Sequence, residues 1–185
     1  MQPTLEKGRL LVAMPTLHDP NFRHSVVLLC EHGPDGSLGL VINRPTAVEV
    51  ATLINDLPDL PARGRVFAGG PVAKDGLLIL CLGAAAEPDG GHRILPDVYL
   101  AKDVSVMRAP ERLGPGGELR CYVGYAGWAA GQLEAELATG AWSVRPAESR
   151  LVFAPDVETV WPEMMRRLGG RWALFAGMPP DPSLN

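Results

Sequence analysis

Three apolar runs at residues 9–14, 25–30 and 38–42 constrain the fold of this chain more than any other feature. The second and third runs surround the sequence HGPDGS, whose glycines, proline and aspartate favour a turn. Two such runs around such a turn predict a β-hairpin. Because both runs lack the polar alternation of a half-exposed strand, we expect this hairpin to be buried on both faces.

The rest of the chain alternates short strand patterns with turns and short helices. Strands clustered in this way predict an α+β fold with a mostly antiparallel sheet and short flanking helices. Since the 185 residues contain no repeat and no long linker, we expect a single domain over residues 1–185. The further strands expected are 65–68, 77–82, 97–101 at a sheet edge, 119–125, 142–144 and 151–153.

Capping patterns predict where the helices begin. Thr46 and Glu49 match a capping box, which predicts a helix from Thr46 to near Asn55. Asp103 predicts the cap of a second short helix, and a glycine-rich hinge precedes a third that reaches Thr139. The last helix is expected at 156–169 with a broken first turn at its proline, while 87–96 and 178–185 read as a loop and a tail.

Charge and hydropathy exclude several classes of protein. The net charge of −4 and the absence of three consecutive basic residues argue against direct nucleic-acid binding, which needs clustered Lys and Arg. The longest apolar run, residues 77–86, is about half the roughly 20 residues that span a bilayer. No signal peptide is read at the N-terminus. The three separated cysteines, Cys30, Cys81 and Cys121, predict buried reduced thiols in a cytoplasmic protein.

Histidines and carboxylates gather around the first hairpin strand, as a metal site requires. They are His18, Asp19, His24, Glu31 and His32. Their spacing matches no common ligand pattern, and a strand of about 20 Å separates His24 from His32 at ~3.3 Å per residue. We therefore interpret them as turn-capping or surface residues and expect no metal.

A hydrolase is the alternative reading of the same region. It would use Ser25 as nucleophile, His32 as base and Asp19 as the group that orients the base. Adjacent strand side chains face opposite ways, so His24 cannot serve Ser25, and no GxSxG motif surrounds the serine. A hydroxyl that closes the HDP turn is the simpler interpretation of Ser25.

Two pairs of polar residues favour binding over catalysis. Asn43 and Arg44 end the second hairpin strand, where an arginine fork could bind a carboxylate or phosphate. Gln132 and Glu134 begin a helix, whose backbone N–H groups attract anions. The alternatives remain open: an asparagine cap in the first case and ordinary first-turn residues in the second.

Glycines and tryptophans also allow a structural and a functional interpretation. The sequences GGP at 69–71 and GYAG at 124–127 follow strands, but neither completes a phosphate-binding motif. We interpret them as positions of positive φ or close backbone approach. The four tryptophans are interpreted as packing residues, with a ligand-binding wall as the alternative; they are Trp128, Trp142, Trp161 and Trp172.

Five segments together resemble the YqgE/AlgH family of bacterial proteins. They are LLVAMPTLHDPNFRHSVVLLCEH, GSLGLVINRP, GGPV, GYAGWAAGQLEAELATGAW and the closing PSLN, and they occur in order over nearly the whole chain. The resemblance implies one α+β domain with a strongly curved, barrel-like sheet, in a cytoplasmic protein with no established cofactor. Members are often labelled transcriptional regulators, yet this chain shows no helix-turn-helix pattern. Ala129 and Ala130 depart from the glycine-proline common in relatives, which affects only the hinge.

The leading hypothesis is therefore a non-enzymatic binding or regulatory module. Its site would be a groove where the strand end at Asn43 and Arg44 meets the helix start at Gln132 and Glu134. An unknown protein partner or a small anionic ligand would occupy this groove, and the plentiful apolar runs could also form a homodimer interface. The positions that match the family motifs are Asp19, Pro20, Phe22, Ser25, His32, Gly39, Asn43, Pro45, Gly124, Tyr125, Gly127, Trp128, Gly131, Gln132, Leu133, Glu134 and Trp142.

Overall fold

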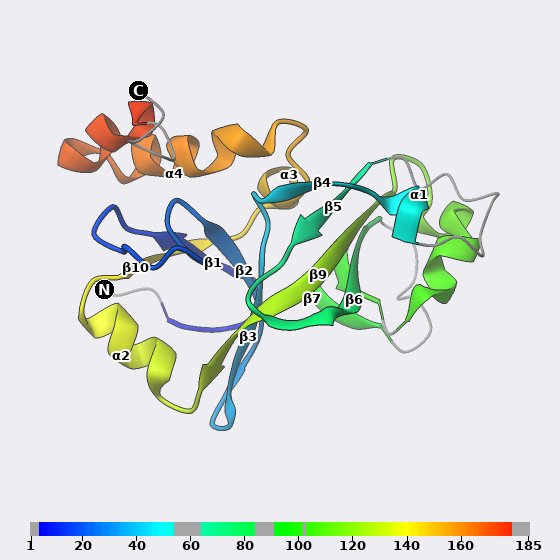
Figure 1. Cartoon of the computed structure of the whole chain (residues 1–185), viewed down its shortest axis with the longest axis horizontal. Coiled ribbons are helices and arrows are strands. Elements are labelled where there is room, and N and C mark those ends of the chain that lie inside the picture. The colour runs from blue at the N-terminus through cyan, green and yellow to red at the C-terminus, as the bar shows by residue number, and fades with distance from the viewer. Residues whose placement is uncertain (1–3, 54–63, 84–90, 102, 179–185) are drawn as a thin grey trace.

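A ten-stranded sheet with short helices on both sides forms the framework of the molecule (Figure 1). The computed structural model describes residues 4–53, 64–83, 91–101 and 103–178. In these ranges the strands are β1 (Arg9–Ala13), β2 (Val26–Gly33), β3 (Gly36–Val41), β4 (Pro45–Glu49), β5 (Arg65–Ala68), β6 (Val72–Leu82), β7 (His92–Leu95), β8 (Val98–Leu100), β9 (Glu118–Ala129) and β10 (Trp142–Pro146).

The strand order is β10-β1-β2-β3-β9-β6-β8-β7, with β4 joined to β5 and β5 joined to β9. Every pair is antiparallel except β5 with β9, so the predicted α+β fold with a mostly antiparallel sheet is confirmed. The outermost strands, β10 and β7, do not pair with each other within the described ranges. The sheet is therefore open, and the barrel-like closure expected from the family resemblance is not confirmed.

The helices are short. They are α1 (Val50–Leu53), α2 (Gln132–Ala138), α3 (Ser149–Val152) and α4 (Val160–Leu168), with 3₁₀ turns η1 (Val104–Arg108), η2 (Pro110–Leu113), η3 (Val157–Thr159) and η4 (Gly170–Gly177). Figure 1 shows α4 on one side of β10, β1 and β2, and α2 on the other. None of the helices in the described part of the chain has the length and hydropathy needed to cross a bilayer.

The predicted hairpin, β2 with β3, is buried on both faces as expected. Leu28 and Leu40 face one core with α3 and α4, while Val27 and Val41 face a second core with α2, and all four are 0% exposed. Each buried side chain of this size contributes about 1.5–3 kcal/mol. Two covered faces explain why the sequence shows continuous apolar runs in place of alternation.

Segment 46–49, predicted as a helix start, is instead strand β4. Thr46 Oγ1 donates to Val66 O of β5 (2.8 Å) and accepts from Val48 N (3.1 Å), so its hydroxyl ties two strands together. Only Val50–Leu53 is helical, and the predicted end near Asn55 lies outside the described residues. Pairing with β5 supplies backbone partners that an isolated capping pattern cannot anticipate.

Three other predictions need correction. The run 151–153 belongs to α3 and its surroundings, because a short apolar run does not distinguish a buried strand from a buried helix. Strand β8 is not at the sheet edge, since β7 pairs with it; β7 in turn occupies part of the predicted 87–96 loop. Residues 87–90 of that predicted loop lie outside the described residues. The tail beyond Met178, including PSLN, also lies outside them. The last helix does break near its start, as η3 followed by α4.

Candidate functional site

Asn43 fastens the open end of the β2–β3 hairpin to the segment that precedes β2. Its Oδ1 accepts from Val26 N (2.8 Å) and its Nδ2 donates to His24 O (2.9 Å). One side chain thus imitates the donor and acceptor of a paired strand residue. Asn43 therefore sets the conformation of residues 19–25, which we call the 19–25 loop.

Arg44 holds the same loop through two more main-chain contacts. Its Nη1 donates to Asn21 O, and its Nη2 donates to Arg23 O (2.8 Å). Burial, followed by the charge of Arg23, lowers the pKa of the Arg44 guanidinium, which nevertheless stays protonated at neutral pH. Because its fork binds two carbonyl oxygens of the 19–25 loop, Arg44 positions this loop.

The 19–25 loop has a specific internal geometry. Asp19 Oδ1 accepts from Asn21 N (2.7 Å), which is the predicted turn-capping role. His24 has a φ of 56°, in the left-handed region, and its ring stacks on Trp161 with centroids 4.0 Å apart. Burial lowers the pKa of His24, and the charges of Arg23 and Arg44 lower it further. Non-glycine residues in this backbone region cost energy and often lie at functional sites.

A pocket of about 620 Å³ opens beside this loop. It lies between the loop, the end of β3 and the start of α4, and Trp161, 2% exposed, forms part of its wall. Trp161 is fixed by its Nε1 donating to Ala13 O (2.8 Å). The lining residues carry charges of both signs as well as apolar surface; they are Pro20, Arg23, His24, Asn43, Arg44, Pro45, Ala68, Glu158, Trp161, Pro162 and Met178.

The other end of the hairpin brings together a hydroxyl, an imidazole and a carboxylate. His32 Nδ1 lies 2.8 Å from Ser37 Oγ across the strand pair, and His32 Nε2 lies 3.8 Å from Glu134 Oε1. The second distance exceeds that of a hydrogen bond, and the Glu134 side chain is 51% exposed. Only the Ser37–His32 pair is thus directly bonded.

The predicted convergence of the two polar pairs is wrong. Gly36, at the start of β3, pairs with Ala129, and Ala129 N donates to Gln132 Oε1, so Gln132 and Glu134 lie at the turn end of the hairpin. Asn43 follows the opposite end of β3, about 20 Å away at ~3.3 Å per residue. The sequence indicated which strand or helix carries each residue. The register between β3 and β9 decides that the two pairs lie at opposite ends of β3.

The predicted hydrolase residues are not assembled either. Ser25 is 0% exposed, and its Oγ has no hydrogen-bond partner among the described residues. The serine closes the loop through its backbone N–H, which donates to Phe22 O (3.0 Å), and not through its hydroxyl. His32 bonds Ser37 instead, near the far end of β2 from Ser25.

Sequence reasoning missed Glu136, which organises the second core. Its Oε2 accepts from the indole N–H groups of Trp128 (3.0 Å) and Trp142 (2.8 Å), and its Oε1 accepts from Gln132 Nε2 (2.9 Å). Phe22 packs on both indoles. Gln132 therefore helps to dock α2, and these two tryptophans are packing residues as predicted. A glutamate within a helix carries no sequence pattern that would reveal such a role.

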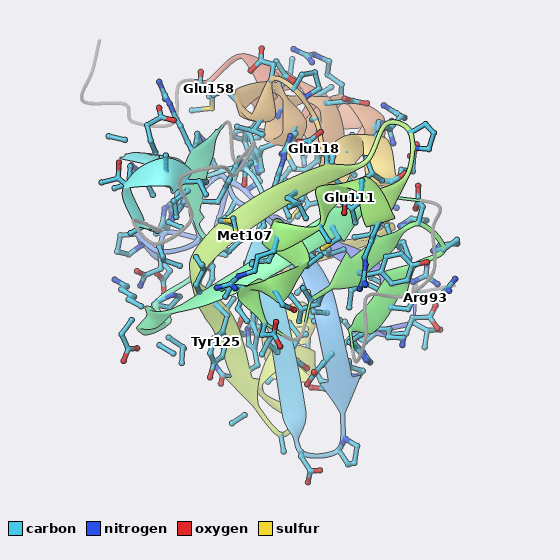
Figure 2. The ribbon with its side chains drawn as sticks, turned by 90° about the vertical axis from the view of Figure 1, so that its right-hand side faces the viewer. Arg93, Met107, Glu111, Glu118, Tyr125 and Glu158 are labelled. Atoms are coloured by element: carbon cyan, nitrogen blue, oxygen red, sulfur yellow. The ribbon has the colours of Figure 1, made fainter. Side chains whose placement is uncertain are left out.

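A buried arginine was missed in the same way. Arg120 is 8% exposed and donates to Val152 O (3.2 Å) and Ala154 O (2.7 Å). Its Nε also donates to Glu118 (3.0 Å), one of the side chains labelled in Figure 2. These bonds join β9 to the end of α3, which makes Arg120 a structural cation.

The glycine-rich turns serve close backbone approach, as the sequence indicated. A Cβ on Gly69 would lie 2.3 Å from Gly124 O, and one on Gly124, whose φ is 68°, would lie 2.4 Å from Gly70 O. Contacts this short exclude any side chain. The two turns pack on each other.

The cysteines are buried and free, as predicted. Burial raises the pKa of Cys30 and Cys81 to about 12 and that of Cys121 to about 11, so the thiols stay protonated at neutral pH. Within the described ranges, no three His, Cys, Asp or Glu side chains are grouped as metal ligands.

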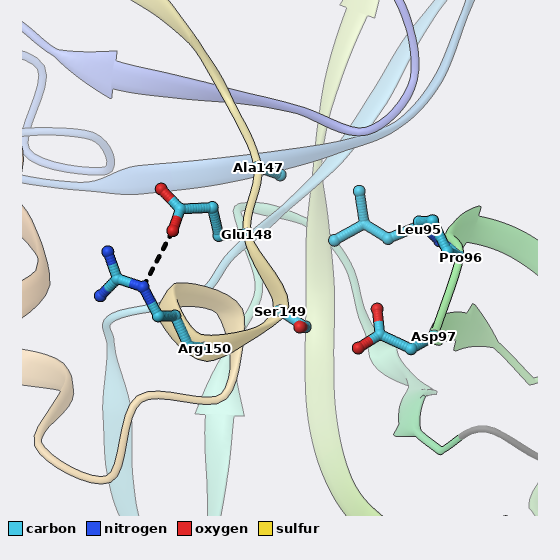
Figure 3. Close-up of a pocket in the computed structure, with 7 residues that line it drawn as sticks. All are labelled: Leu95, Pro96, Asp97, Ala147, Glu148, Ser149 and Arg150. Carbon is cyan, nitrogen blue, oxygen red and sulfur yellow. Dashed lines mark hydrogen bonds and ion pairs between the residues drawn. The ribbon is translucent and has the colours of Figure 1, made fainter.

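A second, smaller pocket of about 340 Å³ lies between the β7–β8 turn and residues 147–150 (Figure 3).

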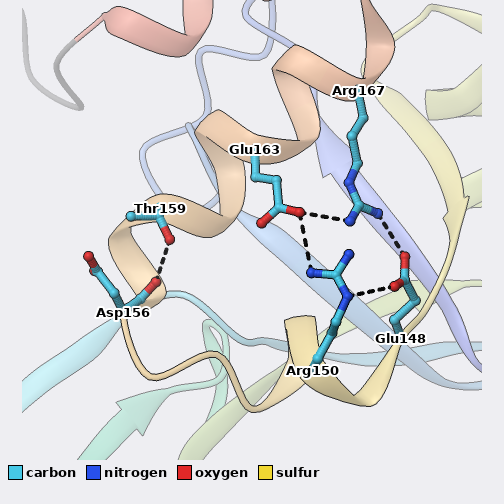
Figure 4. Close-up of polar contacts among 6 residues, drawn as sticks. All are labelled: Glu148, Arg150, Asp156, Thr159, Glu163 and Arg167. Atoms are coloured by element: carbon cyan, nitrogen blue, oxygen red, sulfur yellow. Dashed lines mark hydrogen bonds and ion pairs between the residues drawn. The ribbon is translucent and has the colours of Figure 1, made fainter.

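Beside this pocket, Glu148 and Glu163 each bind both Arg150 and Arg167, which links α3 to α4 (Figure 4). The hydrogen bond from Arg167 is the main cause that lowers the pKa of Glu148. Because these charges are exposed, solvent screening leaves each pair a small contribution to stability.

Comparison with known sequences identifies the family. The sequence model of the AlgH-like family matches residues 10–173. The chain belongs to the AlgH-like family. A UPF0301 protein of Streptomyces coelicolor is 47% identical over 185 residues, covering 96% of this chain and 94% of that protein. A UPF0301 protein of Chlamydia muridarum is 33% identical over 182 residues, covering 98% and 96%.

Two solved structures show that the AlgH-like fold is shared. A crystal structure of a Corynebacterium diphtheriae protein has a TM-score of 0.83 at 26% identity, and it covers 96% of this chain and 95% of that one. The solution structure of the AlgH protein from Pseudomonas aeruginosa has a TM-score of 0.73 at 34% identity, with 97% of each chain covered. The membership predicted from the sequence motifs is therefore confirmed.

Proposed function

We propose that this AlgH-like protein is a binding module that takes a small anionic ligand in the pocket beside the 19–25 loop. The observation that carries the proposal is Arg23. Arg23 lines the pocket, and no hydrogen bond or ion pair of its side chain is found among the described residues. Its own carbonyl, in contrast, is bound by Arg44, so the backbone that presents the guanidinium is held in place.

The charge of the pocket supports an anion. Arg23 and Arg44 contribute two positive charges and Glu158 one negative charge, while the lowered pKa of His24 favours its neutral form. The pocket thus carries an excess of one positive charge on a chain whose net charge is −4. A guanidinium that can offer two parallel N–H groups suits a carboxylate or a phosphate.

The test is a titration with inorganic phosphate and with acetate, followed by NMR shifts of the His24 and Trp161 rings. Losing a hydrogen bond to a charged group costs about 1.5–3 kcal/mol, so Arg23→Gln is expected to weaken binding roughly 10- to 100-fold. Arg65→Gln, an exposed arginine outside the pocket, is the matched control. Equal affinities of the two variants for both anions would refute the proposal.

A regulatory role would follow from this binding without direct contact with DNA. We place the module in the cytoplasm and expect ligand or partner binding to carry any effect on transcription. The acidic chain predicts no gel shift of duplex DNA at low salt. A salt-sensitive shift would contradict this part of the proposal.

The Ser37–His32 bond favours one second candidate, a hydrolase at the turn end of the hairpin. Ser37 Oγ would attack an acyl carbon as its proton passes to His32 Nδ1; the bond from that carbon to the leaving group would break, and the leaving group would take the proton. Water would then hydrolyse the acyl-serine and restore the Ser37 hydroxyl. A fluorophosphonate probe tests it. Labelling of Ser37 that disappears in His32→Asn supports this candidate, and an unlabelled Ser37 in the wild type excludes it.

A further inference from the structure

The polar groups of the pocket differ in how much bonding capacity remains to them. Asn43 uses its oxygen and its nitrogen on the backbone, and Arg44 uses both terminal nitrogens on carbonyls. His24 has one ring face covered by Trp161. Arg23 and Glu158 are the two lining residues whose charged side chains show no hydrogen bond or ion pair within the described part of the chain.

These two charges come from different elements. Arg23 belongs to the 19–25 loop and Glu158 to η3, which leads into α4. Figure 2 shows Glu158 at the α4 end of the molecule. Much of the remaining lining surface is apolar and comes from prolines, Ala68, Met178 and the Trp161 ring. Since Arg23 and Glu158 do not form an ion pair with each other among the described residues, a ligand that binds both needs its two charges apart, and the apolar lining suits an apolar spacer between them.

We infer that the ligand of this pocket is a small zwitterion, with its anionic group on Arg23 and a cationic amine on Glu158. The inference rests on the proposed function and adds the requirement for a positive group. An exposed Arg–Glu pair formed between these residues would contribute only about 0–1 kcal/mol, so it would not compete strongly with a ligand.

A homologous series of ω-amino acids tests whether the ligand needs a positive group and how far apart its two charges must be. Glycine, β-alanine, γ-aminobutyrate and ε-aminocaproate are titrated into the full chain, with NMR shifts of the His24 and Trp161 rings as the readout. Acetate, propionate, butyrate and caproate are the matched carboxylates, and the corresponding alkylamines are the controls with a positive charge alone. One chain length is expected to bind about fivefold more tightly than its matched carboxylate, the gain of one exposed ion pair.

Two variants test whether Glu158 causes the tighter binding of the amino acid. Glu158→Gln is expected to abolish the preference for the amino acid over the carboxylate and to strengthen binding of the carboxylate alone. Glu111→Gln removes an exposed glutamate that does not line the pocket, and it should leave the preference unchanged. A preference that survives in Glu158→Gln overturns the inference.

The outcomes separate the two proposals. If no ω-amino acid binds better than its carboxylate, while Arg23→Gln still weakens carboxylate binding, the zwitterion inference is wrong and the anion site stands. If carboxylates, phosphate and amino acids all fail to move the His24 and Trp161 signals, both proposals are wrong.

Discussion

Both ends of the β2–β3 hairpin carry polar side chains, but these side chains bind different kinds of partner. At the end away from the turn, Asn43 and Arg44 bind main-chain atoms of the 19–25 loop, whose His24 ring stacks on Trp161. At the turn side, His32 and Ser37 bind each other, and the nearby Glu134 is half exposed. Side chains that bind main-chain atoms of several residues restrict a whole loop, whereas two side chains that bind each other restrict only themselves. The difference explains why a structured pocket forms at one end of the hairpin.

The largest effect is expected for Asn43→Ala. The substitution leaves Val26 N and His24 O without their partners in a partly buried place, so the free energy of unfolding should fall by about 2–4 kcal/mol. Urea denaturation measures the change. A loss below about 1 kcal/mol would show that water replaces the amide and that the two ends do not differ.

Arg44→Gln should have a smaller effect. Two hydrogen bonds to carbonyls are lost at the edge of the pocket, where water partly replaces them, so about 1–2 kcal/mol of stability is expected to disappear. Arg44→Lys keeps the charge but cannot form the fork, so it should recover little of the loss. Full recovery by lysine would mean that charge, and not the paired contacts, holds the loop.

The pH dependence of stability should come in part from His24. Its pKa is lowered from 6.5, so the unfolded chain binds a proton more readily than the folded one. Stability is therefore expected to fall as the pH falls below 6.5 and to level off below the folded-state pKa. His24→Asn removes this titration and tolerates the left-handed backbone. The difference in unfolding free energy between wild type and variant is measured from pH 5 to about pH 8, and a constant difference would contradict the assignment.

The smallest effect is expected at the turn end. Ser37→Ala removes one part-buried hydrogen bond between two side chains and leaves no main-chain group without its partner, so stability should change by no more than about 0.5–1 kcal/mol. Comparison with Asn43→Ala in the same urea series sharpens the contrast between the ends. A loss as large as that of Asn43→Ala would make the turn end equally important to the fold.

The sequence was informative wherever the deciding interactions are local. The apolar runs predicted β1, β2 and β3 and their burial, and the HDP turn predicted the capping role of Asp19. The Thr46 capping pattern misled, because pairing between β4 and β5, twenty residues apart in the chain, outweighed a local preference.

By itself the sequence determined the family, the fold class and the residues worth suspecting, because hydrophobic periodicity and turn chemistry act over a few residues. Only the tertiary structure decided which of those residues meet. The register of β3 placed Asn43 and Gln132 at opposite ends, and η3 and α4 brought Glu158 and Trp161 to the 19–25 loop from more than a hundred residues away. A pocket is made by contacts between distant segments, and these follow from packing of the whole chain and not from any one stretch of it.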